Sequence, residues 1–174
     1  MADLTFNTTP GQTIDRNLLM LYLNTGTAAS PEWHAIGKRV EDSSMEMDWG
    51  QETKTDIMGN TYTTQKKPTI TQTFDPCELD SNDPAQVMLW NLAIKDQNAA
   101  ALSALDMLVA HLYVDVGGEG AKFAVRQSAC AISPTSLGGA GGGFLGMPID
   151  VTLGGERTVG SVTSTGGEIT FAAD

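Results

Sequence analysis

Two short motifs in the chain have residue types that could bind a ligand. Gly141–Gly146 has the spacing G-x-G-x-x-G, which cradles a pyrophosphate when the glycines follow a strand and open a helix. A methionine and a proline follow here instead, which favours a flexible loop. Asp80–Asp83 offers oxygen ligands for calcium, but Pro84 takes a ligand position and Ala85 replaces the loop glycine. Helix capping explains Asp80–Asp83 better, so neither motif predicts a cofactor or a metal.

Histidines and cysteines are the other candidates for chemistry. His34 lies beside a tryptophan and His111 lies in an apolar stretch. Because no serine or cysteine lies in a recognisable nucleophile motif, both histidines are assigned to core or interface packing. Cys77 and Cys130 lack metal-ligand spacing and are expected to be free thiols in a reducing compartment.

Glu46 and Asp48 are paired acids on one face of an expected strand. Such a pair could perform acid–base catalysis, and loss of a hydrolase activity on changing Glu46 would support an enzyme. The alternating apolar neighbours instead explain the acids as the polar side of a strand. The sequence therefore predicts a protein that is not an enzyme.

Composition limits the class of protein. The 174 residues are 41% hydrophobic, enough for one domain, and the formal net charge is −11. An acidic chain is a poor partner for phosphates, so tight binding of nucleic acid is disfavoured. The most apolar stretch, residues 99–116, is interrupted by polar residues, so neither a membrane span nor a signal peptide is expected.

The most informative stretch, Ser43–Asp75, predicts a long β-hairpin. Its first arm alternates apolar and acidic residues, and its second arm is rich in β-branched residues. Gly59 and Asn60 are expected to supply the positive φ values of the turn. Residues 51–65 are too polar to pack on a core, and an isolated ribbon is marginally stable. We therefore expect this half to contact another protein chain, through Gln51, Glu52, Thr53, Lys54, Thr55, Asp56, Met58, Gly59, Asn60, Thr61, Tyr62 and Thr63.

The remaining patterns predict a mainly β protein. Leu18–Leu23 and Met107–Val114 are apolar on both alternating faces, as in strands that are covered on both sides. Gly117–Gly120 indicates a turn into a strand at Lys122–Arg126, and further strands are expected at residues 149–153 and 168–171. The expected core anchors are Trp33, Ile36, Met47, Trp49, Ile70, Phe74 and Trp90.

One helix is expected between these strands. Asp83 is placed to be its N-cap, Pro84 its first residue and Gln86 the partner in a capping box. The helix should run to about Gln97, with an apolar face made by Val87, Trp90 and Ile94 and helped by Leu89 and Ala93.

These elements predict an antiparallel β-sandwich or barrel with one flanking α-helix and a long protruding β-hairpin. A single domain should span residues 1–174. Residues 1–15 are expected to be a mobile N-terminal arm and residues 51–65 the protruding hairpin.

The runs at residues 33–44, 49–52 and 67–74 resemble the major tail protein, or tail tube protein, of long-tailed phages and prophages. The helix that starts at Asp83 and the strand Glu168–Phe171 fit the same pattern. The resemblance spans most of the chain and lies in the order of its segments and in their residue patterns.

The resemblance implies a structural subunit. Its copies would form hexameric rings that stack into a hollow tube with an acidic lumen, through which DNA passes as cargo without tight binding. Its partners would be itself, the tail terminator, the tape-measure protein and baseplate or tip proteins, with no cofactor and no membrane. The site of action would be the virion tail, assembled in the host cytoplasm as part of a contractile tail, a non-contractile tail or a phage-tail-like bacteriocin.

A different structural or binding module is the main rival. A capsid-decorating or tail-tip β-sandwich could bind a host surface ligand, such as a carbohydrate, through exposed aromatic residues. The aromatic content is 6%, although Tyr62 lies near the hairpin tip. Binding of a glycan by the monomer would favour this rival.

Overall fold

The computed structural model describes residues 4–117 and 120–174. The first three residues of the expected N-terminal arm, and Gly118 and Glu119 of the expected turn, lie outside the described residues. The strands in this part of the chain are β1 (Leu19–Asn24), β2 (Trp33–Ile36), β3 (Met45–Asp48), β4 (Glu52–Thr55), β5 (Thr61–Thr64), β6 (Thr69–Phe74), β7 (Leu105–Asp115), β8 (Lys122–Pro134), β9 (Ile149–Leu153), β10 (Arg157–Thr165) and β11 (Glu168–Ala173). The helical segments are η1 (Arg16–Leu18), α1 (Pro84–Trp90), η2 (Asn91–Lys95) and α2 (Ala99–Leu102).

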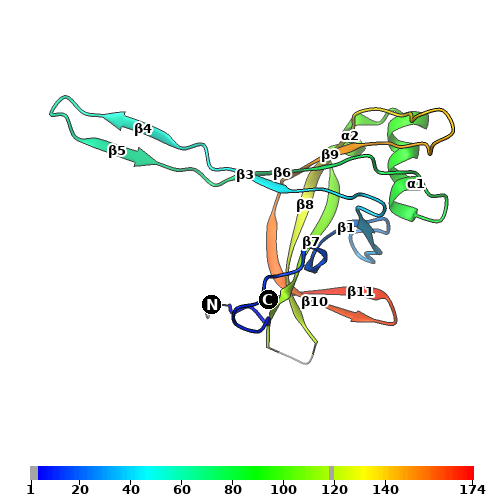
Figure 1. The fold of residues 1–174 in the computed structure, drawn as a ribbon, viewed down its shortest axis with the longest axis horizontal. Helices are drawn as coiled ribbons and strands as arrows, with labels where there is room; N and C mark the ends of the chain where they lie inside the picture. The colour runs from blue at the N-terminus through cyan, green and yellow to red at the C-terminus, as the bar shows by residue number, and fades with distance from the viewer. Residues whose placement is uncertain (1–3, 118–119) are drawn as a thin grey trace.

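All strand pairs are antiparallel, and β8 links two sheets. Its first half pairs with β7 on one edge and β10 on the other, so Val125 lies between Val109 and Val159. Its second half pairs with β9, where Ile132 faces Val151. One sheet therefore has the order β2-β1-β7-β8-β10-β11, and the other has the order β8-β9-β6-β3; they are continuous through β8, and β4 and β5 form a separate two-stranded sheet. The expected mainly β fold with antiparallel sheets and a flanking helix is confirmed (Figure 1).

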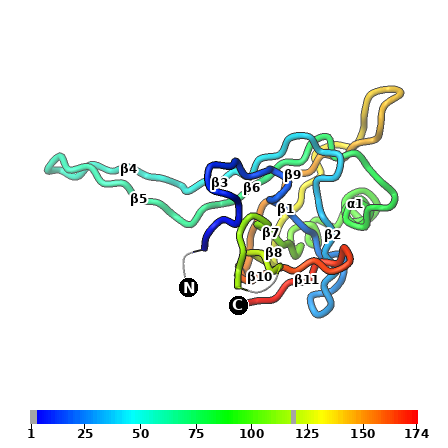
Figure 2. The backbone as a smooth tube through the Cα atoms, turned by 60° about the horizontal axis from the view of Figure 1, so that its bottom comes forward, coloured from blue at the N-terminus to red at the C-terminus, as the bar shows by residue number. Residues whose placement is uncertain are grey.

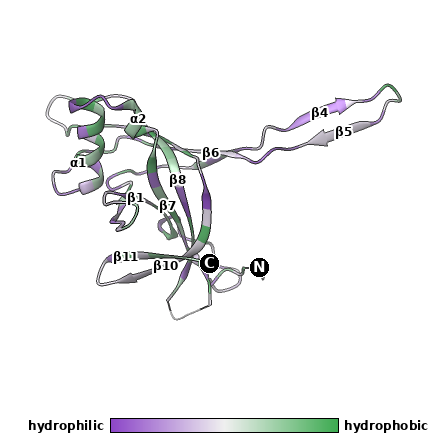
Figure 3. Ribbon diagram, turned by 180° about the vertical axis from the view of Figure 1, so that it is seen from behind, coloured by the Kyte–Doolittle hydropathy of each residue, from purple (hydrophilic) through white to green (hydrophobic). Residues whose placement is uncertain are grey.

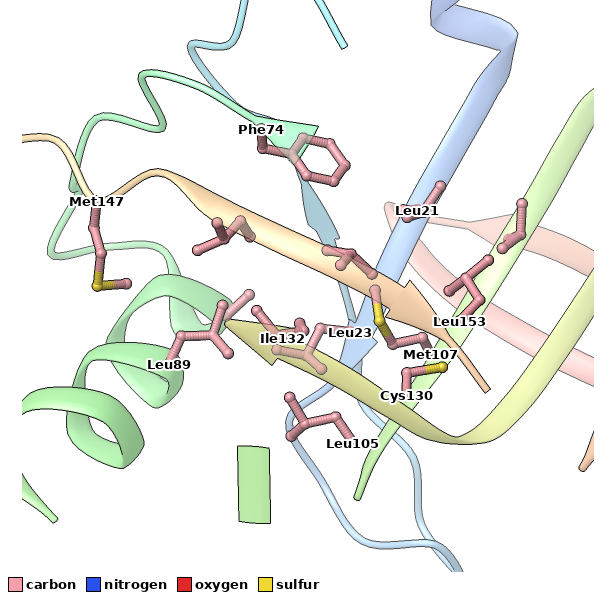
Figure 4. Close-up of a cluster of buried hydrophobic side chains, with 14 residues drawn as sticks. Leu21, Leu23, Phe74, Leu89, Leu105, Met107, Cys130, Ile132, Met147 and Leu153 are labelled. Atoms are coloured by element: carbon pink, nitrogen blue, oxygen red, sulfur yellow. The ribbon is translucent and has the colours of Figure 1, made fainter. Parts of the chain in front are cut away.

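Two apolar clusters use the opposite faces of the first sheet. Leu21 and Leu23 of β1 point into the cluster between the sheets and α1, which Figure 4 shows. Tyr22, between them in sequence, packs on the other face with Trp33 and Leu108. This second face is enclosed because the β10–β11 hairpin curls back toward β2. The prediction that residues 18–23 and 107–114 are covered on both faces is confirmed for residues 21–23 and 107–110, which the chain's own core buries, whereas residues 18–20 and 111–113 are half-buried.

Helix α1 begins as expected and buries a different face. The Asp83 carboxylate accepts hydrogen bonds from the backbone N–H groups of Ala85 and Gln86 at 3.0 and 3.2 Å. Gln86 does not close a capping box; its Oε1 accepts from the backbone N–H of Asp80 at 2.6 Å, so it ties the preceding loop to the helix. Ala85 and Leu89 are buried, whereas Val87 is exposed.

The predicted helix face was therefore wrong at Val87 and Ile94. It was right at Leu89, which is buried, and at Trp90, which packs against the core. The chain has two adjacent apolar stripes, and the sheet takes the one with Ala85 and Leu89. At Asn91 the helix changes to π geometry, with Asp96 N–H bonded to the Asn91 carbonyl at 2.9 Å. This inserts one residue into the turn and rotates Ile94 away from the core.

The glycine-rich segment is a loop, as expected. Gly138 and Gly146 exchange backbone hydrogen bonds at 3.0 and 2.7 Å, which close the loop at its base. Gly146 also bridges to Glu78, so the loop is attached beside α1. The described segment does not open a helix, as a dinucleotide site would require.

Candidate assembly interface

The hairpin leaves the body of the protein within strand β3 (Figures 1 and 2). Met45 and Ile70 pack against the core, but Met47 is 52% exposed and Trp49 is 46% exposed. The prediction that Met47 and Trp49 anchor the core was wrong. Period-2 alternation does place them on the same face as Met45, but the strand passes beyond the edge of the core before it reaches them.

The other expected anchors are in the core or against it. Trp33 and Phe74 are buried in the two clusters, and Ile36, Ile70 and Trp90 are half-buried against the larger one.

The outer half of the hairpin, β4 and β5, is exposed on both faces. Opposite threonine hydroxyls are 3.2 Å apart in the pair Thr53–Thr63 and 3.3 Å apart in the pair Thr55–Thr61. The Glu52 carboxylate lies 3.3 Å from Lys66 Nζ. These contacts fix the register, and all residues of both strands are exposed. Figure 3 shows β4 in the hydrophilic colour, β5 near the middle of the scale and a hydrophobic tip. A ribbon of this kind is marginally stable alone.

The turn at the tip is organised by Asp56. One carboxylate oxygen accepts the backbone N–H groups of Met58 and Asn60, both at 2.9 Å, and the other accepts the Asn60 side-chain amide at 3.1 Å. These bonds, chiefly those from Asn60, lower the pKa of Asp56. Gly59 has φ +83°, as expected, whereas Asn60 does not have the expected positive φ because its side chain and backbone both bond Asp56.

The turn at the hairpin tip, which Asp56 holds by hydrogen bonds, exposes its apolar residues to solvent. Ile57 is fully exposed and Met58 is 82% exposed. Large apolar side chains exposed on a hydrogen-bonded turn outside the core are candidates for contact with another molecule. The structure thus places the expected contact residues on one ribbon, and Ile57 at its apex is a further exposed apolar residue that the sequence-based set omitted.

Besides β4 and β5, which pair only with each other, three described strands end a sheet without a partner on one side. They are β3 at one end, and β2 and β11 across from each other at the other end. Strands β2 and β11 line a groove of about 500 Å³ between them. Unpaired edges are templates for pairing with another chain.

A larger groove lies at the root of the hairpin. It has a volume of about 590 Å³ and lies between β1, the segment after β2 and the end of β6. Gln72 of β6 lines it and is only 2% exposed; its Nε2 donates to the Ser43 hydroxyl at 2.8 Å, while its buried Oε1 has no hydrogen-bond partner among the described residues. The Arg16 guanidinium donates to the Ser43 carbonyl at 2.9 and 3.1 Å at the same groove. No sequence pattern indicates this groove, apart from a glutamine at an inward position of a strand.

The N-terminal arm contacts the body through part of its length. Phe6 forms a bridge with Val114, and its ring meets the Tyr113 ring edge-on at a centroid distance of 5.3 Å. The Asn7 backbone N–H donates to the Tyr113 carbonyl at 2.9 Å. This part of the arm is attached to β7, and the expectation of a mobile arm remains a prediction for the residues around it.

The two histidines occupy packed positions. His111 Nδ1 lies 2.9 Å from the Tyr113 hydroxyl, and burial, with a smaller effect of Arg157, lowers its pKa. His34 lies in β2 opposite Leu23 of β1. The His111 ring also packs on the Phe123 ring at a centroid distance of 5.5 Å, so its contacts fit the packing role.

The fold defines a class before any comparison: a curled antiparallel sheet joined to a second sheet, one flanking helix and a projecting hairpin. Compared with solved structures, the chain is similar to a sheath/tube terminator of an extracellular contractile injection system (PVC, extended state), with a TM-score of 0.51 and 10% identity over 87% of this chain and 99% of that chain. The likeness concerns the fold.

Two further similarities are weaker. The tube-terminating cap of the anti-feeding prophage gives a TM-score of 0.47 and 12% identity over 88% of this chain and 94% of that one. A chain of the PVC sheath–tube complex gives 0.48 and 9% identity over 86% of this chain and 93% of that one. No family model and no curated protein matches the sequence. No helix in the described ranges has the length and apolar character to cross a bilayer.

Proposed function

We propose that this chain is a structural, non-enzymatic subunit of the tail tube of a phage or of a phage-tail-like particle. Copies form hexameric rings, and the rings stack into a hollow tube. The hairpin β4–β5 is the observation that carries this proposal. It is an ordered ribbon outside the core, polar along its length and apolar at Ile57 and Met58. Because this hairpin adds nothing to the chain's own core, a contact with the neighbouring ring would explain why the chain has it.

Open strand edges support contacts within a ring. Strand β3 ends one sheet, while β2 and β11 end the other on both sides of a groove. Pairing between neighbouring copies would remove these edges, and closed symmetry would let each copy use the same two surfaces. The exposed Met47 and Trp49 beside the β3 edge would be covered by the same contacts.

The excess of acidic over basic residues supports a tube lumen through which DNA can slide. The formal net charge is −11, and duplex DNA carries about one negative charge per 1.7 Å. Like charge keeps DNA from sticking to the wall. Because screening limits the repulsion to about 8 Å at physiological salt, it lubricates the passage without blocking it. The partners of such a tube are the other proteins of the tail.

A tube terminator is the second candidate, because the fold is similar to that of a sheath/tube terminator with a TM-score of 0.51. A terminator forms rings that cap a tube, whereas a tube subunit stacks without limit. The two roles therefore differ in what the pure protein assembles.

Negative-stain microscopy of the purified chain over a wide concentration range separates them. We expect hollow tubes of repeating rings. Rings that never stack would favour the terminator, and a monomer at every concentration would contradict both roles.

A further inference from the structure

The hairpin tip has apolar surface that its own chain leaves uncovered. Ile57 is fully exposed and Met58 nearly so. Their positions are fixed because the Asp56 carboxylate holds the turn through the backbone of Met58 and Asn60. A preorganised apolar turn loses little entropy on docking, so it is suited to fill a groove.

The groove at the hairpin root has a matching lining. Its volume is about 590 Å³. The apolar residues that line it are Leu19, Met20, Leu21, Ile36, Val40 and Phe74. The buried Oε1 of Gln72 has no hydrogen-bond partner in the described part of the chain.

The charges beside the groove match the charge on the hairpin. A hollow of about 190 Å³ shares Ser43 and Gln72 with the groove and is lined by the carboxylates of Asp42, Glu46 and Asp75. None of these three carboxylates is in an ion pair among the described residues.

Lys54 is the cation nearest the hairpin tip. It precedes Asp56 by two residues on strand β4 and its turn, about 7 Å along the hairpin. Its only ion-pair partner in the described chain is the exposed Glu52, at 3.5 Å. The ammonium group is therefore free to leave Glu52 and to pair with carboxylates of another copy.

We propose that the tip of one copy's hairpin docks in the groove at the root of the next copy's hairpin. Ile57 and Met58 cover the apolar lining, and Lys54 meets the acidic hollow. This docking rests on the proposed stacking of rings and names the receiving surface. Nine residue steps from Asp48 to Ile57 span about 30 Å, so copies related by a displacement of that order along the hairpin bring tip and groove together. The contact joins two different surfaces, so it repeats indefinitely, as a tube requires.

Disulfide capture tests this contact. Ile57→Cys places a thiol at the tip, and Glu41→Cys places one at the exposed lip of the groove. Both changes are on the surface and leave the core intact, and the native thiols are buried. Mild oxidation of the assembled double variant should give a ladder of covalent multimers on a non-reducing denaturing gel. Each single variant should give no species beyond a dimer.

The matched control pairs Ile57→Cys with Glu168→Cys, an exposed residue of the groove between β2 and β11. Assembly without the 57–41 ladder, or an equal ladder from the 57–168 pair, overturns the docking inference and leaves the proposed function standing. A wild-type chain that never assembles overturns the proposed function, and the inference with it.

An exchange of charges gives a second readout. Lys54→Glu should raise the protein concentration needed for half-maximal assembly by about fivefold, as the loss of one interface ion pair does. Adding Glu46→Lys should restore assembly toward the wild-type concentration. Failure of Glu46→Lys to compensate would overturn the placement of Lys54 in the acidic hollow.

Discussion

Asp56 and Asn60 are bonded to each other across the turn that ends the hairpin. The Asp56 carboxylate accepts the Asn60 backbone N–H at 2.9 Å and its side-chain amide at 3.1 Å. One side chain therefore sets the shape of a surface that lies far from the core.

Removing the Asp56 carboxylate should loosen the turn and spare the fold. Asp56→Ala should leave the free energy of unfolding close to that of the wild type, because the hairpin contributes little to the core. The amide NMR signals of Met58 and Asn60 should move toward random-coil positions, and assembly should weaken. Unchanged signals would contradict the role of Asp56.

The same turn should depend on pH. Hydrogen bonds to the carboxylate lower the pKa of Asp56 below its ordinary value of 3.8. The bonds are therefore fully present above that ordinary value and are lost as the pH falls through the lowered pKa. Amide shifts of Asn60 should stay constant from neutral pH down to about pH 4 and change below it. A change that starts near neutral pH would contradict this assignment.

Helix α1 offers a matched pair of substitutions. Leu89→Ala should cost about 3 kcal/mol, because it opens a cavity in the core between the sheets and the helix. Val87→Ala, two residues away on the exposed stripe, should change the free energy of unfolding by about 0.5 kcal/mol or less. Chemical denaturation of the monomer measures both, and equal costs would show that the buried face is misplaced.

Local signals predicted this helix well and its orientation poorly. Asp83 is the N-cap and Pro84 is the first helical residue, and the four-residue sequence Asp83–Gln86 predicts both. The choice between the stripes of Leu89 and Val87 depends on the sheet beneath them, and the π turn at Asn91 has no sequence signature. Periodicity alone therefore could not decide which stripe is buried.

A polar network supports the curled sheet. Asp106 accepts from Arg126 Nε at 3.0 Å and from an Arg126 terminal nitrogen at 2.7 Å, and Asn24 Nδ2 donates to it at 3.0 Å. The Asp106 carboxylate raises the pKa of Arg126, whose guanidinium also lies 5.7 Å from the Trp33 ring centroid.

Asp106→Ala should therefore cost about 2 kcal/mol, the scale of hydrogen bonds to a charged group. Asp96→Ala removes only an exposed contact with Lys95 at 3.7 Å and should cost about 0.5 kcal/mol or less. A measured difference near zero between the two variants would contradict a structural role for the network.

The two thiols should be unreactive in the folded chain. Burial raises the pKa of both Cys77 and Cys130, with a smaller effect from Asp83 on Cys77. A raised pKa leaves less thiolate at a given pH, and the thiolate is the reactive form. An aromatic disulfide reagent at pH 8 should label neither thiol until denaturant is added, whereas Ile57→Cys should react at once. Prompt labelling of the wild type would contradict the burial.

The hairpin divides into parts that the sequence could and could not predict. Alternation and turn chemistry predicted its strands and its polar outer half. The alternation of apolar and polar residues predicted that Met45, Met47 and Trp49 lie on one buried face. Only Met45 packs against the core. Where a strand leaves the body depends on the length of its partner strands. The groove at Gln72 likewise arises from segments far apart in sequence, so no local pattern could indicate it.

Shortening the hairpin tests the central claim most directly. Thr53 and Thr63 are paired across β4 and β5, so an Asn-Gly dipeptide in place of residues 54–62 makes a two-residue hairpin turn that keeps their register. Negative-stain microscopy of the wild type beside this variant should show hollow tubes for the first, and folded monomers or single rings without tubes for the second. Tubes formed equally by the shortened variant, or a wild type that stays monomeric at every concentration, would contradict the account.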